Sequence, residues 1–280
     1  MKIAKDWKDY TVLATGNGEK LERWGNVVLL RPDPQVIWHA QKSLKVKELN
    51  AQYLRESTGG GRWEYLKPMP EEWTVSYSGV KFLIKPMGFK HTGLFPEQAV
   101  NWDMMTSLVK NSKRKIKVLN LFAYTGGASV MLANAGADVT HVDAAKGMVA
   151  RAKENAELNG ITNIRYIVDD CEKFINREIK RGNFYDAVLM DPPSYGRGPN
   201  GEMWKLEDNL FDFVKLVSKV MSDKPLFVLI NSYTTGLSAS VLENILKLCF
   251  NGGTAESYEV CLPTEEGIVL PCGSSGIMRW

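Results

Sequence analysis

A glycine turn followed by an acidic strand end is the pattern with the clearest chemical meaning in this chain of 280 residues. Residues 117–128 read Lys-Val-Leu-Asn-Leu-Phe-Ala-Tyr-Thr-Gly-Gly-Ala, which predicts a buried strand, a glycine turn and a helix. The next predicted strand ends on Asp143, 17 residues after Gly126. A carboxylate at that place can accept hydrogen bonds from both hydroxyls of a ribose, so the pattern indicates a nucleotide-binding βαβ unit.

The same turn limits the kind of nucleotide. A dinucleotide pyrophosphate is typically held by a loop with three spaced glycines, whereas this loop has only Gly126 and Gly127. Because glycine has no Cβ, the loop backbone can contact the amino-acid part of a different adenosine cofactor. The residues expected to hold this cofactor are Phe122, Ala123, Tyr124, Thr125, Gly126, Gly127, Asp143 and Ala144.

Two acidic residues also have a structural interpretation. Asp143 precedes Ala-Ala-Lys and can instead begin the next helix as its N-cap. Asp170 follows the strand predicted at residues 164–168, where it can accept a hydrogen bond from an adenine amino group while Cys171 packs against the ring. Asp170 can equally be an ordinary N-cap. The sequence leaves these alternatives open.

A further strand end carries Asp191-Pro-Pro-Ser-Tyr195, directly after the apolar residues 187–190. Two consecutive prolines make a stiff turn with two fixed φ angles and two missing donors, which leaves backbone carbonyls to accept from a substrate amino group. Asp191 is expected beside the amino-acid part of the cofactor, and Tyr195 either stacks on a flipped base or packs within the protein. The candidate catalytic residues are therefore Asp191, Pro192, Pro193 and Tyr195.

The elements that position these residues alternate regularly from residue 116 onward. Strands are predicted at residues 118–122, 139–143, 164–168, 186–190 and 226–230, with helices at 128–135, 146–158, 210–221 and 239–250 and another ending at 181. Such alternation predicts a doubly wound parallel sheet. Only about four residues separate the last two strands, so these must form an antiparallel hairpin. An α/β Rossmann-like sheet that ends in a hairpin is typical of class I S-adenosylmethionine-dependent methyltransferases.

The motifs resemble a particular branch of that class. The loop at 120–128, Asp143, the run Glu154-Asn-Ala-Glu-Leu-Asn-Gly160 and Asp191-Pro-Pro-Ser-Tyr are similar to class I rRNA methyltransferases related to the large-subunit rRNA cytosine-5 methyltransferases. The resemblance also covers residues 91–98, which lie over the cofactor in that family, and residues 270–280. It implies S-adenosyl-L-methionine as the cofactor, Phe95 and Gln98 as further contacts to it, and a base of ribosomal or other structured RNA as the substrate.

One position departs from that family. Cytosine-5 methylation needs a cysteine thiolate as nucleophile, which the relatives carry just after the fifth strand. Residues 230–233 here read Ile-Asn-Ser-Tyr, and the residue after Asp-Pro-Pro is Ser194. Asn and Ser cannot supply a nucleophile of thiolate strength. Cys272, flanked by glycine, is another candidate, which we interpret as structural, so the sequence leaves open whether carbon or nitrogen is methylated.

The residues ahead of this domain differ in composition. We predict a small β-rich domain with a linking helix at 1–112 and the methyltransferase domain at 113–280. In the first, paired strands are expected at 73–78 and 80–85, and residues 41–56 are ambiguous. Residues 1–115 hold 19 Lys and Arg against 12 Asp and Glu, and five of the eight Trp precede residue 75. Both a nucleic-acid surface and a Trp-filled core with solvated lysines explain this composition.

The composition also limits the cellular location and the kind of protein that this chain can be. The charged start is unlike a signal peptide, and no apolar run approaches the roughly 20 residues of a membrane span. The four cysteines lack CxxC spacing, so we expect reduced thiols, no metal, and a soluble cytoplasmic protein. Methylation of a protein or a small metabolite is the main alternative to RNA. A non-catalytic RNA-binding relative is disfavoured by the intact Asp143 and Asp191.

Overall fold

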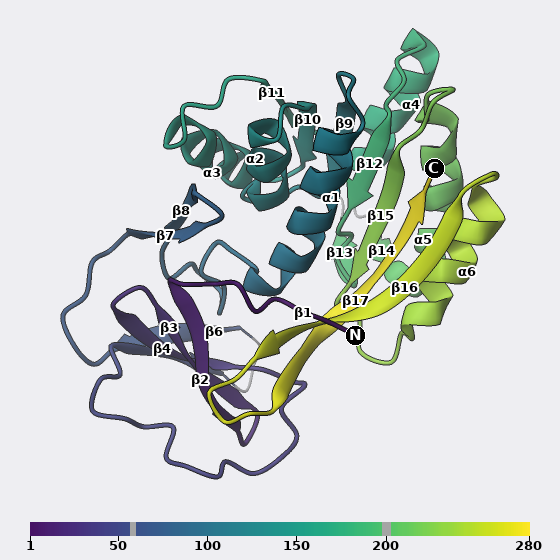
Figure 1. The fold of residues 1–280 in the computed structure, drawn as a ribbon. Coiled ribbons are helices and arrows are strands. Elements are labelled where there is room, and N and C mark those ends of the chain that lie inside the picture. The colour runs from purple at the N-terminus through teal and green to yellow at the C-terminus, as the bar shows by residue number, and fades with distance from the viewer. Residues whose placement is uncertain (57–59, 198–202) are drawn as a thin grey trace. The chain divides into compact units, whose positions relative to one another are not determined.

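The computed structural model describes residues 1–56, 60–197 and 203–280, which form two compact units (Figure 1). The first, called the sheet unit here, comprises Met1, residues 101–259 and residues 273–280. The second, called the β-rich unit, comprises residues 2–100 and 260–272. Within the ranges that the structure describes, no helix is long and apolar enough to cross a membrane.

The sheet unit contains the predicted parallel sheet (Figure 1). Five parallel strands lie in the order β15-β12-β9-β10-β11. Their bounds are β9 Lys117–Leu121, β10 Asp138–Asp143, β11 Ile164–Val168, β12 Ala187–Met190 and β15 Phe227–Ser232. The order reverses between β9 and β12, and open α/β sheets bind their ligands at the carboxyl ends of the strands on either side of such a reversal.

The antiparallel ending of the sheet is also confirmed. Strand β17 (Val269–Arg279) is antiparallel to β15, and β16 (Thr254–Pro263) lies next to β17, with the short β1 (Lys2–Ile3) beside β16. Strand β17 extends to residue 279, although the run Gly-Ser-Ser-Gly at residues 273–276 lacks the alternation that is typical of a strand. The reason is its small residues: a Cβ on Gly276 would lie 2.8 Å from Cβ of Leu242, so the helix above leaves no space for a side chain.

Five helices cross between these strands: α2 (Gly127–Asn134), α3 (Lys146–Glu157), α4 (Cys171–Arg181), α5 (Leu206–Val217) and α6 (Ala239–Cys249). Helix α1 (Ala99–Asn111) precedes β9, and a short 3-10 helix (Ser218–Val220) follows α5. Helix α5 begins four residues before the predicted start because Leu206 is also fully buried. The apolar core packs α4, α5 and α6 against the sheet through residues that include Phe174, Phe213, Val228 and Leu242.

The β-rich unit has a five-stranded sheet in the order β2-β3-β4-β5-β6 and a separate hairpin of β7 and β8. Their bounds are β2 Tyr10–Gly16, β3 Glu19–Trp24, β4 Val27–Pro32, β5 Ala51–Arg55, β6 Gly61–Tyr65, β7 Trp73–Tyr77 and β8 Val80–Ile84. The ambiguous residues 41–56 therefore contain strand β5 and no helix. A 3-10 helix (Pro96–Gln98) leads into α1, so the β-rich character predicted for the first part of the chain is confirmed.

A buried ion cluster lies within the sheet of this unit. Glu22 is fully buried, and its carboxylate accepts hydrogen bonds from Arg31 Nε at 2.6 Å and from the Tyr10 hydroxyl at 2.6 Å. Lys20 Nζ lies 3.7 Å from the same carboxylate. Burial alone would raise the pKa of Glu22, but Arg31 and Lys20 outweigh it and hold that pKa at about 2. Buried charges of this kind are tolerated only when they are paired.

Candidate cofactor and substrate site

Candidate binding and catalytic residues lie at the ends of four neighbouring strands of the sheet unit. Asp191 follows β12, Phe122 follows β9, Asp143 ends β10, and Asp170 lies two residues after β11. The ladder places these strand ends side by side at one edge of the sheet. With about 4.8 Å between neighbouring strands, the row from Asp191 to Asp170 spans roughly 15 Å. An elongated ligand along this edge would meet all four positions.

The loop after β9 has an unusual backbone. Phe122, Tyr124 and Gly126 all have positive φ, at 53°, 51° and 81°. Left-handed conformations in residues other than glycine cost about 1–3 kcal/mol and are concentrated at functional sites. Gly126 is also required by packing, because a Cβ there would lie 2.7 Å from Cβ of Ala152 on α3. Gly126 is therefore needed both for the positive φ of the turn and for the close contact with helix α3. The sequence had predicted it only for the close approach of the backbone to the cofactor.

Neighbouring elements hold this strained loop in place. The Tyr124 amide donates to Asp143 Oδ2 at 2.8 Å, and the Phe122 amide donates to Cys171 Sγ at 3.3 Å. Asn155, fully buried on α3, donates from Nδ2 to the Thr125 carbonyl at 2.9 Å. Asn155 was not among the candidate residues, although it lies in the 154–160 run that carried part of the resemblance.

Buried polar side chains also lie behind the loop. Ser129 Oγ accepts from Asn120 Nδ2 at 2.8 Å and lies 3.0 Å from His141 Nδ1. Burial lowers the pKa of His141 to about 4, so this imidazole is neutral at physiological pH. His141 is fully buried, and its role is structural.

Asp143 is half-buried at the centre of the row, and both of its oxygens are already in use. Oδ2 accepts from the Tyr124 amide and Oδ1 from the Ala145 amide, each at 2.8 Å. The N-cap of α3 is Ala145, not Asp143, so the N-cap alternative for Asp143 is wrong. Each carboxylate oxygen has a second lone pair, and these two sites can still accept the two hydroxyls of a ribose.

Asp170 and Cys171 begin helix α4. Asp170 is the N-cap, with Oδ1 accepting from the Lys173 amide at 2.9 Å, so the structural alternative for Asp170 is confirmed. A contact from its second oxygen to an adenine amino group stays a prediction. Cys171 is 4% exposed, and burial raises the pKa of its thiol well above the usual value. Its neutral sulfur packs under the loop instead of acting as a nucleophile.

The Asp-Pro-Pro turn is held by residues that the sequence pattern did not reveal. Trp204 donates from Nε1 to the Pro193 carbonyl at 2.6 Å, and its ring lies 5.6 Å from that of Phe122. Trp204 comes from the hairpin of β13 (Tyr195–Arg197) and β14 (Met203–Lys205), which was not predicted. One lone pair of the Pro193 carbonyl is therefore occupied, and the other remains for a substrate donor. Tyr195 lies on the same hairpin and is 50% exposed.

The position after the fifth strand, where the resemblance implies a cysteine, has a structural role here. Asn231 is 5% exposed, and its Oδ1 accepts from Asn101 Nδ2 at 3.1 Å and from Ser275 Oγ at 2.7 Å. Asn101 in turn accepts from the Tyr258 hydroxyl at 2.6 Å. Ser194, the residue after Asp-Pro-Pro, accepts from the Thr234 hydroxyl at 2.6 Å. Neither position offers a nucleophile.

Three residues considered in the sequence belong to the β-rich unit. Phe95 is half-buried with its ring 5.4 Å from that of His91, and Gln98 is 7% exposed. Their contact with the cofactor stays a prediction. Cys272 is half-buried, and desolvation raises the pKa of its thiol well above the usual value, which agrees with a structural role. In the part of the chain that the structure describes, no three His, Cys, Asp or Glu side chains are grouped to hold a metal.

The row is long enough for one adenosine cofactor to lie along it. Acceptors for a ribose lie at Asp143, and a second carboxylate lies two strands away at Asp191, beside the strained loop. The small residues between them suit an amino-acid group better than a pyrophosphate. Residues 30–237 match the family model of S-adenosylmethionine-dependent methyltransferases, so the chain belongs to that family and S-adenosyl-L-methionine is its cofactor.

Particular members of the family resemble the chain over different lengths. A crystal structure of the SAM-dependent methyltransferase from Agrobacterium tumefaciens is 35% identical with a TM-score of 0.92, covering 100% of this chain and 93% of that one. Ribosomal RNA large subunit methyltransferase K/L from Shewanella frigidimarina is 29% identical over 204 residues, 71% of this chain and 27% of that protein. Ribosomal RNA large subunit methyltransferase I from Aeromonas salmonicida is 32% identical over 43% of this chain and 30% of that protein. The chain thus spans less than a third of these two curated relatives.

Proposed function

We propose that this protein transfers a methyl group from S-adenosyl-L-methionine to a base of structured RNA, with ribosomal RNA as the first candidate. The observation that carries the proposal is the Asp191-Pro-Pro turn, which stands beside the strained loop and continues into a hairpin with an exposed Tyr195. An exposed ring next to a rigid acceptor turn suits a flat substrate that bears an amino group. The rRNA methyltransferases among the relatives support this substrate class, which would place the reaction in the cytoplasm.

Different residues at this edge of the sheet bind different parts of the cofactor. Asp143 accepts the ribose hydroxyls through its remaining lone pairs, and Asp170 and Cys171 face the adenine. The backbone of residues 122–127 and the Asp191 carboxylate hold the amino-acid part. The bound cofactor supplies a methyl group on a sulfonium, so the protein needs chiefly to align acceptor and methyl group for in-line displacement. Apolar surroundings favour the transition state, in which the sulfonium charge disperses.

The acceptor that fits best is a base nitrogen. Methylation at a pyrimidine carbon needs a thiolate, and Asn231 and Ser194 occupy the positions where relatives carry their nucleophiles. Cys171, the thiol at this edge of the sheet, is buried with a raised pKa. An amino group can instead donate to Asp191 and to the second lone pair of the Pro193 carbonyl. The nitrogen then takes the methyl group and releases a proton to solvent.

Labelled cofactor provides the direct test. The protein is incubated with methyl-labelled S-adenosyl-L-methionine and total RNA from a methylation-deficient strain, and the modified nucleoside is identified by mass spectrometry. We expect label on an N-methylated nucleoside, and no label with the variant Asp191→Ala. Label on 5-methylcytidine would contradict the nitrogen assignment. Label that enters only protein or small metabolites would show that the RNA proposal is wrong.

A further inference from the structure

The tryptophans of the β-rich unit have structural roles. Trp24 is fully buried. The other four are half-buried, and each donates its indole N–H to a protein oxygen at 2.8–3.1 Å: Trp7, Trp38, Trp63 and Trp73. The Trp-rich composition is therefore explained by the fold. Any surface for stacking on bases must be formed mainly by other rings.

Two such rings lie at the edge of the five-stranded sheet. Tyr65 on the edge strand β6 is 61% exposed, and Phe89 is 69% exposed. Trp63 connects them: it shares a face of β6 with Tyr65, two residues away, and its Nε1 donates to the carbonyls of Met87 at 2.8 Å and Phe89 at 3.2 Å. These bonds hold the loop that carries Phe89 against β6. Trp63, Tyr65 and Phe89 are called the aromatic strip below.

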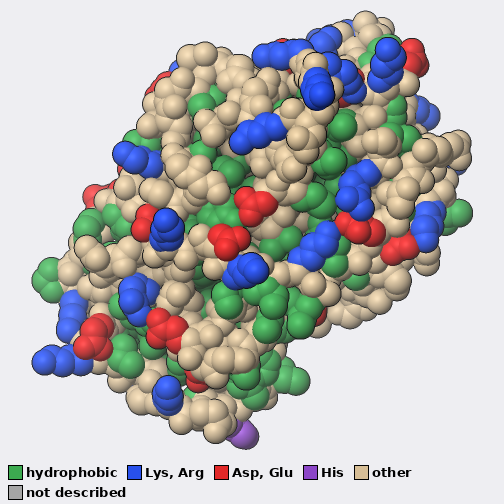
Figure 2. All heavy atoms as spheres, viewed as in Figure 1, with side chains coloured by type: hydrophobic (Ala, Val, Ile, Leu, Met, Phe, Trp, Pro, Cys, Tyr) green, Lys and Arg blue, Asp and Glu red, His purple; other side chains and the backbone are tan. Residues whose placement is uncertain are grey.

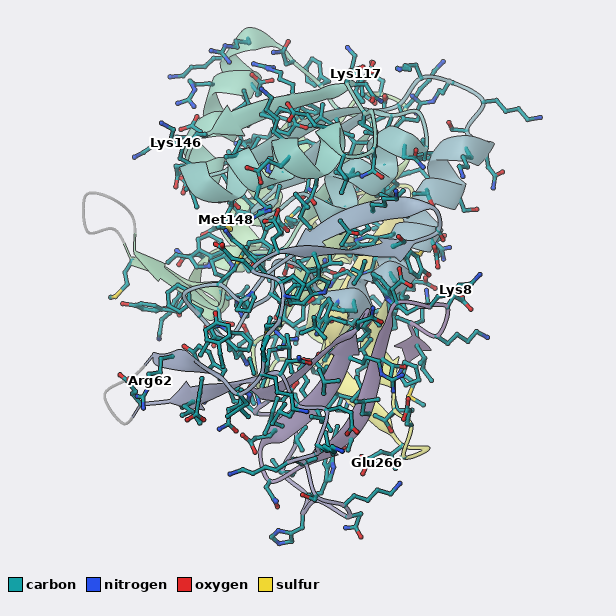
Figure 3. The ribbon with its side chains drawn as sticks, turned by 90° about the vertical axis from the view of Figure 1, so that its left-hand side faces the viewer. Lys8, Arg62, Lys117, Lys146, Met148 and Glu266 are labelled. Atoms are coloured by element: carbon teal, nitrogen blue, oxygen red, sulfur yellow. The ribbon has the colours of Figure 1, made fainter. Side chains whose placement is uncertain are left out.

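Cations are frequent in the sequence segments that carry the aromatic strip. Residues 42–67 contain six Lys and Arg against three Glu, and residues 80–91 contain three Lys and no acid. Arg55 is paired with Gly61 across the ladder, which places it on the same face as Trp63. Figure 3 shows Arg62 at the outer end of the β5–β6 hairpin. Its partner across the ladder is Leu54, so Arg62 lies on the opposite face from Trp63, where it forms an exposed ion pair with Glu56 at 3.1 Å. Figure 2 shows Lys and Arg interspersed with acidic side chains on the face it displays, so charge alone marks no single site there.

We infer that the aromatic strip, with Arg55, binds single-stranded RNA. Exposed rings stack on bases of any sequence, and cations beside them neutralise the phosphates. Duplex RNA hides the faces of its bases, so a single strand fits the strip better. Protein interfaces are depleted of Lys, whereas seven of the nine cations in these two segments are Lys, so RNA is favoured over a protein partner. This inference rests on the proposed RNA substrate and assigns part of its recognition to the β-rich unit.

Fluorescence anisotropy tests the inference with a defined probe. The full chain is titrated onto a fluorescein-labelled 12-nucleotide RNA of mixed sequence, either as a single strand or annealed to its complement. We expect tighter binding of the single strand and at least a tenfold loss in the double variant Tyr65→Ala/Phe89→Ala, since each stacked ring contributes roughly 5- to 150-fold. The Tyr65→Phe variant keeps the ring and should bind like the unaltered protein.

Two controls separate the strip from general effects. Phe184 is 51% exposed on the sheet unit, so Phe184→Ala removes a comparable ring elsewhere and should leave RNA binding unchanged. The variant Arg55→Gln should lower the slope of log affinity on log salt by about 0.7, the value for one phosphate that is no longer neutralised. Cofactor affinity, measured by calorimetry on every variant, should stay unchanged and shows that each variant is folded.

The outcomes distinguish this inference from the proposed function. If RNA is methylated but Tyr65→Ala/Phe89→Ala binds the single strand like the unaltered protein, the strip is not the RNA surface while the proposed function stands. Equal affinity for the duplex and the single strand would also overturn the inference. If no RNA is methylated, the proposed function fails, whatever the anisotropy shows.

Discussion

The replacement of Asp143 by alanine is the sharpest test of the cofactor site. Its two oxygens hold the amides of Tyr124 and Ala145 at 2.8 Å, and their second lone pairs are assigned to the two ribose hydroxyls. Asp143→Ala therefore removes two predicted bonds to the cofactor. It also releases the Tyr124 amide, which helps to hold that residue at a φ of 51°.

The magnitude follows from the number of bonds. A hydrogen bond to a charged group contributes about 1.5–3 kcal/mol, so losing both ribose bonds costs about 3–6 kcal/mol. The dissociation constant for S-adenosyl-L-methionine, measured by isothermal titration calorimetry, should rise roughly 10²- to 10⁴-fold. Asp143→Asn keeps one oxygen acceptor and places an NH₂ against a backbone N–H, so its loss should fall between those of Asp143→Ala and the unaltered protein.

Asp138 supplies a matched control on the same strand. It lies at the opposite end of β10, where its carboxylate forms an exposed ion pair with Lys115 at 2.9 Å. Exposed pairs contribute at most about 1 kcal/mol to stability, so Asp138→Ala should be stable and bind the cofactor normally. A dissociation constant for Asp143→Ala within threefold of the unaltered value would refute the assignment of the ribose to Asp143.

Three further outcomes follow from the contacts. Gly126→Ala places a Cβ 2.7 Å from that of Ala152 at a φ of 81° and should lower the free energy of unfolding in urea by about 1–3 kcal/mol; an unchanged midpoint would contradict this. Trp204→Ala removes a hydrogen bond and a ring contact beside the substrate turn, so methyl transfer with labelled cofactor should slow about tenfold while calorimetric cofactor affinity stays within threefold; equal loss of both would place Trp204 in cofactor binding instead. Glu22→Gln leaves Arg31 without its buried counterion and should cost about 3–5 kcal/mol in urea unfolding at pH 7. Because the folded pKa of Glu22 is about 2, below its ordinary 4.5, its contribution is present above about pH 4.5 and is lost as the pH falls toward 2, so the two proteins should converge in acid.

The sequence predicted the sheet and its ligand edge because both depend on local signals. Asp191 follows the short apolar run 187–190, and Asp143 ends a strand that contains Val139 and Val142. The parallel topology brings both strand ends to one edge of the sheet. The glycine turn at residue 126 was equally visible. The bends at Phe122 and Tyr124 could not be predicted, because bulky residues seldom adopt positive φ. They do so here because hydrogen bonds from neighbouring elements fix the loop.

Long-range contacts account for what the sequence did not show. The hairpin that carries Trp204 consists of two three-residue strands, too short for a periodic pattern. Strand β17 reads as a loop near Gly276, since its small residues are dictated by helix α6 packing above them. Asp170 shows the limit of motif assignment: an N-cap and an adenine contact need the same residue at the same place, and the structure establishes only the first.

The Asn231 network shows why the position after the fifth strand, where the resemblance implies a cysteine, holds an asparagine in this chain. Asn101, Ser275 and Tyr258 surround Asn231 with donors and acceptors on helix α1 and strands β16 and β17, all bonded at 2.6–3.1 Å. A thiol is a weak hydrogen-bonding group and would leave part of this buried network unsatisfied. At the end of β15, Asn231 therefore connects strands β16 and β17 to helix α1 through this hydrogen-bond network. Because that position is structural, the reaction proposed above relies on the alignment of acceptor and methyl group by Asp191, the Pro193 carbonyl and the loop after β9, and its proposed acceptor is a base nitrogen that supplies its own lone pair.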